Sequence, residues 1–322
     1  MSIFNKLRIS HLIDPQEKQA LSKQEELSPG LYSQNLSIED IRKVYENERQ
    51  YWNQNLPLVK YIEEKSIKTR YNNVKVHLFS NIKEKSPAII FIHGGGFILG
   101  STNTHRSIIH RLCNLSGYKV ISIDYSLAPE AKFPQQLEEC MDVILDIKNN
   151  STKWNIDPKQ ISFCGDSAGA ALSLGLFLKL RDENILDERL NIKSLLLAYG
   201  TYGLRDSMTR RLYGNELDGL TEEELDKYFK LYLNDQEEAK NPYIDLLSAD
   251  LKNKIPPTYI VGAELDPLLD DSRALYTILK SNGINCEIEI ANGVLHAFWQ
   301  HSLMVDKAEK SIKMAIEFLK NI

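Results

Sequence analysis

A pentapeptide near the middle of the chain has the residue types of a serine nucleophile. Gly165-Asp166-Ser167-Ala168-Gly169 follows a short apolar run at 160–163 and opens a longer apolar stretch at 170–180. In the sharp strand-to-helix turn that such a motif makes, the serine stands at the tip and the glycines leave room for a close chain crossing. G-x-S-x-G alone is common by chance, so the flanking strand and helix patterns are what make Ser167 the predicted nucleophile.

A serine hydroxyl is a weak nucleophile near neutral pH and needs a base, which an acid in turn orients. Downstream of Ser167 the only histidines are His296 and His301. We expect His296 on a loop just past a strand at 286–290, whereas His301 is expected in or near the last helix, at the surface. The predicted base is therefore His296, in the chain order serine, acid, histidine.

Several carboxylates compete to be the acid. Asp266 follows a predicted strand and stands before Pro267, a residue that suits the first turn of a helix. Asp270 and Asp271 would begin or cap that helix. Asp266 is therefore the predicted acid, and Glu264 is the second choice.

A glycine run follows a second apolar run. His93-Gly94-Gly95-Gly96 comes directly after residues 88–92. Backbone N–H groups on such a run can receive an oxyanion, and the residue after the nucleophile, Ala168, adds another donor. The spacing of the glycines is one residue too long for a dinucleotide-binding loop, a plain glycine turn stays open, and His93 is expected to anchor the loop.

The elements that must position these residues alternate along the chain. The pattern predicts a hairpin of strands at 67–71 and 74–79, then strands at 88–92, 119–123, 160–163, 193–198, 258–261 and 286–290. Helical patterns lie at 105–116, 135–149, 169–181, 270–281 and 304–320. Such alternation predicts an α/β fold with a mainly parallel sheet and helices on both faces.

We expect one structural domain with an accessory lid. Residues 1–65 look polar and helical, with a capping-box-like start at Ser37-Ile38-Glu39-Asp40, and are the expected N-terminal cap segment. The core is expected at 66–198 and 251–322. Between them, 199–250 shows charged helical sequence without a good strand, as a lid over an active site would. Tyr199, Tyr202 and Tyr213 are the residues we expect to shorten its pocket.

Composition excludes several classes of protein. The 322 residues are 43% hydrophobic and 26% charged, with a net charge of −5, so no basic field exists to attract nucleic acid. The N-terminus shows no secretory signal and the apolar runs are too short to span a bilayer, so a cytoplasmic location is expected. The 4 cysteines form no C-x-x-C pair, which predicts reduced core thiols and no metal site.

These motifs together resemble the hormone-sensitive-lipase family of α/β-hydrolases. The resemblance is carried by the glycine run, the serine pentapeptide, Asp266-Pro267-Leu268-Leu269-Asp270 and Leu295-His296-Ala297-Phe298. It also includes Asp124-Tyr125-Ser126-Leu127-Ala128-Pro129-Glu130, a structural brace in which many relatives have arginine at position 126. Further similarity at 49–53, 96–100, 202–207, 209–211 and 266–272 is to the bacterial acetyl esterases.

The resemblance implies the α/β-hydrolase fold with a helical cap, no cofactor, and hydrolysis of acetyl and other short acyl esters. Carried over by position, Ser167, Asp266 and His296 are the catalytic triad, and the N–H groups of Gly95, Gly96 and Ala168 form the oxyanion hole. A small ester is the expected partner, and a homodimer or a regulatory protein partner is compatible with the sequence. An amidase or peptidase, or a regulatory binding protein on a hydrolase scaffold, stays open as an alternative.

Overall fold

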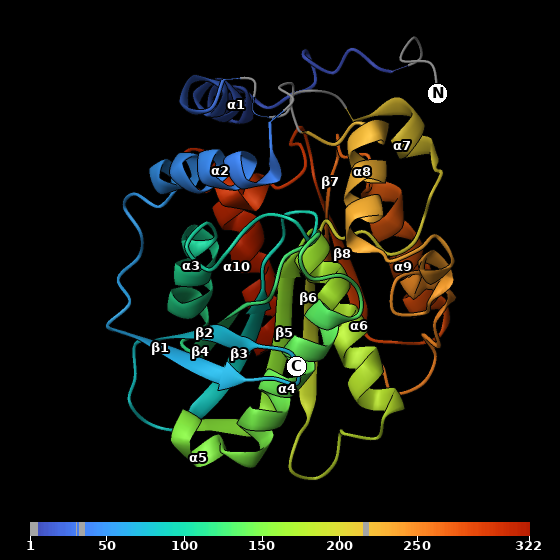
Figure 1. Cartoon of the computed structure of the whole chain (residues 1–322). Helices are drawn as coiled ribbons and strands as arrows, with labels where there is room; N and C mark the ends of the chain where they lie inside the picture. The colour runs from blue at the N-terminus through green and yellow to red at the C-terminus, as the bar shows by residue number, and fades with distance from the viewer. Residues whose placement is uncertain (1–5, 30, 32–35, 215–218) are drawn as a thin grey trace.

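The computed structural model describes residues 6–29, 31, 36–214 and 219–322. Its centre is an 8-stranded sheet in the order β1-β2-β4-β3-β5-β6-β7-β8 (Figure 1). The strands are β1 (Tyr61–Lys68), β2 (Asn73–Ser80), β3 (Ser86–Ile92), β4 (Lys119–Asp124), β5 (Ile156–Asp166), β6 (Ile192–Ala198), β7 (Thr258–Ala263) and β8 (Cys286–Ala291). Strand β2 runs antiparallel to both of its neighbours, β1 and β4. The other six strands, in the sheet order β4-β3-β5-β6-β7-β8, pair in parallel. The predicted α/β class is confirmed.

Helices cover both faces of the sheet. They are α1 (Pro15–Leu27), α2 (Ile38–Trp52), α3 (Arg106–Ser116), α4 (Gln135–Asn149), α5 (Ser151–Trp154), α6 (Ala168–Asp182), α7 (Met208–Leu212), α8 (Glu222–Tyr232), α9 (Leu269–Ser281) and α10 (Asp306–Lys320), with short 3₁₀ turns η2 (Glu237–Lys240), η3 (Leu246–Ser248) and η4 (Phe298–His301). Apolar residues of α4, α6 and α9 form one core with the sheet, and those of α3 and α10 form the other.

The buried strands explain why this sheet forms. Every residue of β7 is buried, as are all but one residue of β3 and of β6. Strands with two covered faces need continuous apolar runs, and βαβ crossovers supply the covering helices. All four cysteines are free and buried in this core. None of the described helices combines the length and apolar character that a bilayer crossing demands.

The first strand departs from its prediction. The sequence predicted a strand at 67–71, but β1 occupies Tyr61–Lys68 and residues 69–72 form the turn into β2. Strand β1 is an edge strand whose first four side chains are exposed. Because neither face is deeply buried, its sequence lacks the alternation on which the prediction depends. The remaining predicted strands and helices lie at or within a few residues of their expected positions.

Helices α1, α2, α7 and α8 do not cover the faces of the sheet. They lie over the end of the sheet where the parallel strands finish (Figure 1). The N-terminal α2 is tied to the loop after β3, because Arg42 donates from Nε to the carbonyl oxygen of Ile98 over 2.8 Å. In the insertion at 199–250, the described residues form helices and turns but no strand. Ser37 caps α2 by accepting from the N–H of Asp40, as the capping-box-like motif predicted.

Candidate active site

The parallel strands deliver the predicted site residues to one edge of the sheet. The glycine run follows the end of β3, Ser167 follows β5, Asp266 comes after β7, and His296 comes after β8. Carboxyl ends of parallel strands meet at the same edge, where ligands of open α/β sheets bind. The fold therefore brings together loops that are far apart in the chain, such as those of His93 and His296.

Ser167 stands in a strained turn between β5 and α6. Its backbone has φ 53° and ψ −122°, in a region that residues other than glycine rarely occupy. The neighbouring crossing requires glycine, because a Cβ on Gly169 would lie 2.0 Å from the carbonyl oxygen of Ile92. Strain of this kind persists only where the surrounding packing fixes it, and here it puts the serine at the tip of the turn.

Three of the predicted residues form one hydrogen-bonded line. His296 Nε2 lies 2.7 Å from Ser167 Oγ, and His296 Nδ1 lies 2.7 Å from Asp266 Oδ2. Asp266 is fully buried, and its other oxygen accepts from the N–H of Leu268 over 2.7 Å. With Nδ1–H donating to the carboxylate, the lone pair of Nε2 faces the serine hydroxyl, which is the arrangement that a general base requires.

The competing carboxylates are engaged elsewhere. Glu264 accepts from the N–H of Gly293 over 2.7 Å, so it holds the loop that carries the histidine. Asp270 accepts from the N–H of Thr209. Asp271 is fully buried and accepts from the N–H of Tyr202 over 2.7 Å, which anchors the start of the insertion. Burial raises the pKa of Asp271 to about 6, although Arg210 and backbone donors oppose that rise.

The glycine run has the backbone that an anion cradle needs. Gly95 and Gly96 have φ of 116° and 59°, and a Cβ on Gly95 would lie 2.3 Å from the carbonyl oxygen of Leu99. In the described part of the chain, the N–H groups of Gly95, Gly96 and Ala168 donate to no other residue. Ala168 is also the first residue of α6, where the helix dipole favours negative charge.

His93 anchors the glycine run, as the sequence predicted. Its Nδ1 lies 2.8 Å from the carbonyl oxygen of Gly94, and its ring stacks on Tyr125 at 4.3 Å. Tyr125 also donates to the carbonyl oxygen of His93. Burial, reinforced by His105, lowers the pKa of His93 to about 4, so the ring is neutral near neutral pH. Ser126, next to Tyr125, donates from its N–H and its hydroxyl to Glu139 on α4, so the segment is held to this helix without an arginine at position 126.

His301 differs from its prediction. It is 3% exposed and lies in η4, between α1 and α2, rather than at the surface. Its ring packs on Trp52 at 4.7 Å. The amphipathic pattern of α10 does not extend back to residue 301, but nothing in the local sequence shows that helices from the other end of the chain bury it.

Sequence reasoning missed the residues that connect the loops. Asp166, inside the serine pentapeptide, accepts from the N–H of Gly94 over 2.9 Å. Gln300 donates to Asp166 and to His105. Asp166 was visible in its motif as a carboxylate beside a serine, whereas Gln300 carried no local signal.

A small cavity lies among the loop after β3, α6 and the insertion. It is lined by Phe97, Ala171, Leu172, Thr201, Phe229, Tyr232, Tyr243 and Ile244, and has a volume of about 10 Å³. The ring of Tyr232 in α8 stacks on Phe97 at 3.8 Å. The tyrosines expected to shorten the pocket do not line this cavity: Tyr199 packs its ring against His296 at 5.0 Å, and Tyr202 is fully buried.

Comparison with known proteins agrees with this architecture. A family model described as "alpha/beta hydrolase fold" matches residues 89–300. A hyperthermophilic esterase from the archaeon Pyrobaculum calidifontis is 29% identical, with a TM-score of 0.89 and coverage of 96% of this chain and 98% of that one.

Other similar structures are also esterases by name. A thermostable carboxylesterase cloned from a metagenomic library is 27% identical, with a TM-score of 0.84 over 89% of this chain and 97% of that one. A fungal esterase from Rhizomucor miehei is 26% identical, with a TM-score of 0.87 over 97% and 98% of the two chains. With the serine turn, the glycine run and the parallel sheet in place, the chain belongs to the α/β-hydrolase family, in its hormone-sensitive-lipase-like branch.

Proposed function

We propose that this protein hydrolyses carboxylic esters, with Ser167 as nucleophile, His296 as general base and acid, and Asp266 as the group that orients His296. The observation that carries the proposal is the line of hydrogen bonds from Asp266 through His296 to Ser167, at 2.7 Å each. The esterase names of the similar structures support the same bond type.

The proposed reaction passes through an acyl-enzyme. His296 takes the proton of Ser167 as the serine oxygen attacks the ester carbonyl, and the tetrahedral oxyanion accepts from the N–H groups of Gly95, Gly96 and Ala168. His296 then gives the proton to the leaving alcohol. A water molecule, deprotonated by His296, attacks the acyl-enzyme, and His296 returns that proton to Ser167 Oγ as the acyl–oxygen bond breaks and the acid leaves.

We also propose a preference for short acyl groups such as acetyl. Phe229 and Tyr232 pack their rings against Phe97, which directly follows the proposed oxyanion donors Gly95 and Gly96, and the cavity that these side chains leave has a volume of about 10 Å³. Phe229 and Tyr232 lie on α8, so a helix of the insertion closes this cavity. In this proposal the insertion and the N-terminal helices together act as the lid.

The nucleophile assignment is tested with Ser167→Ala. We expect the folded variant to lose turnover of p-nitrophenyl acetate and stoichiometric labelling by a fluorophosphonate probe, while the wild type shows both. A folded variant that cleaves the ester at the wild-type rate would overturn the assignment. Wild-type protein that neither labels nor turns over would instead favour the regulatory binding protein, and faster cleavage of anilides than of esters would favour the amidase.

The acyl preference is tested with a series of p-nitrophenyl esters. We expect kcat/KM to fall from acetyl to octanoyl in the wild type, and Phe229→Ala to raise the octanoyl-to-acetyl ratio about tenfold or more, because filling an apolar pocket discriminates on this scale. A wild-type rate that climbs steadily with chain length would contradict the proposal.

A further inference from the structure

The turn η4 joins the loop of His296 to the N-terminal helices. Gln300, the third residue of the turn, is 3% exposed and makes contacts in three directions. Its Oε1 accepts from the hydroxyl of Tyr45 on α2 over 3.0 Å. Its Nε2 lies 3.0 Å from His105 Nε2 and donates to Asp166 Oδ2 over 3.4 Å. One buried amide therefore links helix α2 to the turn that carries the nucleophile.

Asp166 extends this link to the proposed oxyanion donors. It directly precedes Ser167, and its Oδ1 accepts from the N–H of Gly94 over 2.9 Å. The donors of Gly95 and Gly96 follow on one loop, and that of Ala168 follows Ser167 on the other. The Asp166 carboxylate thus fixes the spacing between the two loops, because it is covalently part of one and hydrogen-bonded to the other.

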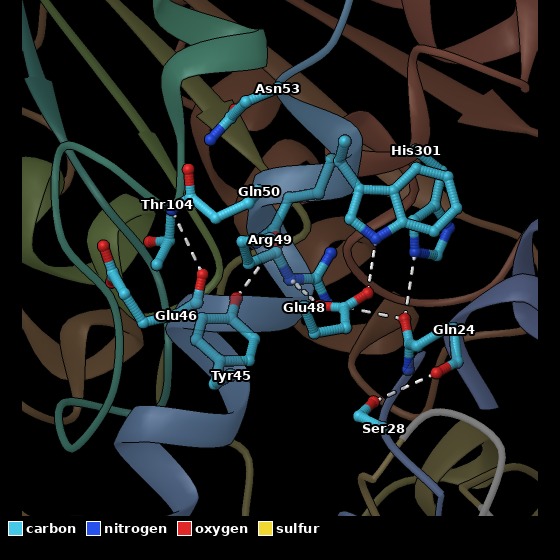
Figure 2. A network of polar contacts seen from close by, with 12 residues as sticks. Gln24, Ser28, Tyr45, Glu46, Glu48, Arg49, Gln50, Asn53, Thr104 and His301 are labelled. Atoms are coloured by element: carbon cyan, nitrogen blue, oxygen red, sulfur yellow. Dashed lines mark hydrogen bonds and ion pairs between the residues drawn. The ribbon is translucent and has the colours of Figure 1, made fainter. Parts of the chain in front are cut away.

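The N-terminal helices hold η4 through a buried polar cluster (Figure 2). His301 lies 3.1 Å from Gln24 Oε1 on α1, and its Nδ1 lies 3.4 Å from Glu17 Oε1. On α2, Arg49 and Glu48 form an ion pair at 2.8 Å with both side chains buried. Arg49 also donates to Gln24 Oε1 over 3.4 Å, so Gln24 on α1 is linked both to α2 and to η4.

We propose that Gln300 is a positioning residue that couples the docking of helix α2 to the alignment of the oxyanion donors. The path runs from Tyr45 through Gln300 to Asp166, and from Asp166 to Gly94. This inference rests on the proposed function, since it concerns the geometry in which the ester carbonyl becomes an oxyanion. Donors that must be aligned before the reaction lower kcat when they shift, with little effect on ground-state binding.

The test replaces Gln300 by Met, which keeps length and volume but neither donates nor accepts a conventional hydrogen bond. We expect kcat for p-nitrophenyl acetate to fall about tenfold with KM within about twofold, since small displacements of aligned groups cost this much or more. Affinity for a trifluoromethyl ketone, which forms a tetrahedral oxyanion on the serine, should fall in parallel with kcat. A merely structural role would not make the analogue and kcat change together.

A second variant isolates the link to α2. Tyr45→Phe removes only the hydroxyl and leaves the ring under Arg49, whose guanidinium lies 4.7 Å from its centroid. We expect kcat to fall about threefold with unchanged KM, as the loss of one hydrogen bond implies. Tyr51→Phe is the matched control on the same helix, because within the described ranges its hydroxyl has Met304 Sδ, at 3.8 Å, as its hydrogen-bond partner. It should keep the wild-type kcat.

The two variants should not be additive. In Tyr45→Phe/Gln300→Met the path is already broken at Gln300, so kcat should equal that of Gln300→Met alone. Wild-type kcat in both single variants, or equal losses in Tyr45→Phe and Tyr51→Phe, would overturn the inference, and the second comparison holds even if Gln300→Met fails to fold. Wild-type protein without ester turnover or Ser167 labelling would overturn the proposed function instead.

Discussion

At the scale of single residues, two carboxylates near the histidine loop do different work. Asp266 binds His296 Nδ1 directly, whereas Glu264 binds the backbone of Gly293, in the same loop. Asp266 fixes the tautomer of His296, so its loss lowers the rate of the chemical step. Glu264 only holds the loop in place.

We therefore predict that Asp266→Asn lowers kcat by about 10³- to 10⁴-fold with little change in KM, because an amide cannot hold the imidazole in the required tautomer. Glu264→Gln is the control and should stay within about threefold of the wild type, since its amide oxygen still accepts from Gly293. Steady-state kinetics on p-nitrophenyl acetate measure both. A larger loss in Glu264→Gln than in Asp266→Asn would transfer the orienting role to Glu264.

His93 predicts a pH dependence of stability. Burial lowers the pKa of His93 in the folded protein to about 4, from about 6.5 in the unfolded chain. The stabilisation by the neutral ring is therefore complete above pH 6.5 and is lost as the pH falls toward 4. We expect the free energy of unfolding to drop by about 2 kcal/mol more in the wild type than in His93→Gln between pH 7.5 and pH 5. Urea unfolding at the two pH values measures this difference, and an identical drop in both proteins would contradict it.

The sequence predicted the positions of Ser167, Asp266 and His296 because each follows a strand that its own pattern predicts, apolar for β5 and β7 and alternating for β8. It could not predict the burial of His301 or the contacts of Gln300, since their partners on α1 and α2 lie more than 250 residues away. Contacts of that range leave no periodicity in the local sequence.

At the scale of the elements, helix α6 carries a pair of glycines with opposite requirements. A Cβ on Gly169 would lie 2.0 Å from the Ile92 carbonyl oxygen of the crossing strand, whereas one on Gly175 would meet its nearest neighbour at 3.4 Å. The first glycine is required by packing and the second is not.

Gly169→Ala should therefore lower the free energy of unfolding by about 1–3 kcal/mol or more, and it should also reduce kcat, because the serine turn and β3 are forced apart. Gly175→Ala should be neutral or stabilise by up to about 1 kcal/mol, as alanine is the better helix former. Thermal unfolding together with ester kinetics distinguishes the two. Equal stability of both variants would contradict the tight crossing.

The elements also show where sequence patterns fail. Strands β3, β6 and β7 are covered on both faces, and their continuous apolar runs predicted where they lie. In β5 only the last part is such a run, so the prediction began four residues late. Strand β1 lies at the sheet edge with exposed charges such as Glu63 and Glu64, so the pattern placed it too late. Its position is set by pairing with β2 rather than by its own side chains.

At the scale of the whole molecule, the N-terminal helices bury charged side chains, among them the Glu48–Arg49 ion pair of α2. Replacing Arg49 by Met should lower the free energy of unfolding by about 3–5 kcal/mol, because Glu48 would be left charged and buried. The control is Lys43→Met on the same helix, whose ion pair with Glu39 is largely exposed and should contribute at most about 1 kcal/mol. Denaturant unfolding measures both, and equal losses would show that burial of the Glu48–Arg49 pair is unimportant.

The packing of α1 against the last part of the chain has a consequence for synthesis. Gln16 on α1 donates to Asp306, 290 residues later, and the N–H of Asp14 donates to the carbonyl oxygen of Gly293. At ordinary rates of translation, roughly 15 to 60 s separate the appearance of these partners. Helix α1 leaves the ribosome long before the surface that it covers exists. A nascent chain therefore carries an undocked helix α1 until Gly293 and Asp306 are made, and in our proposal Gln300 aligns the oxyanion donors only after that.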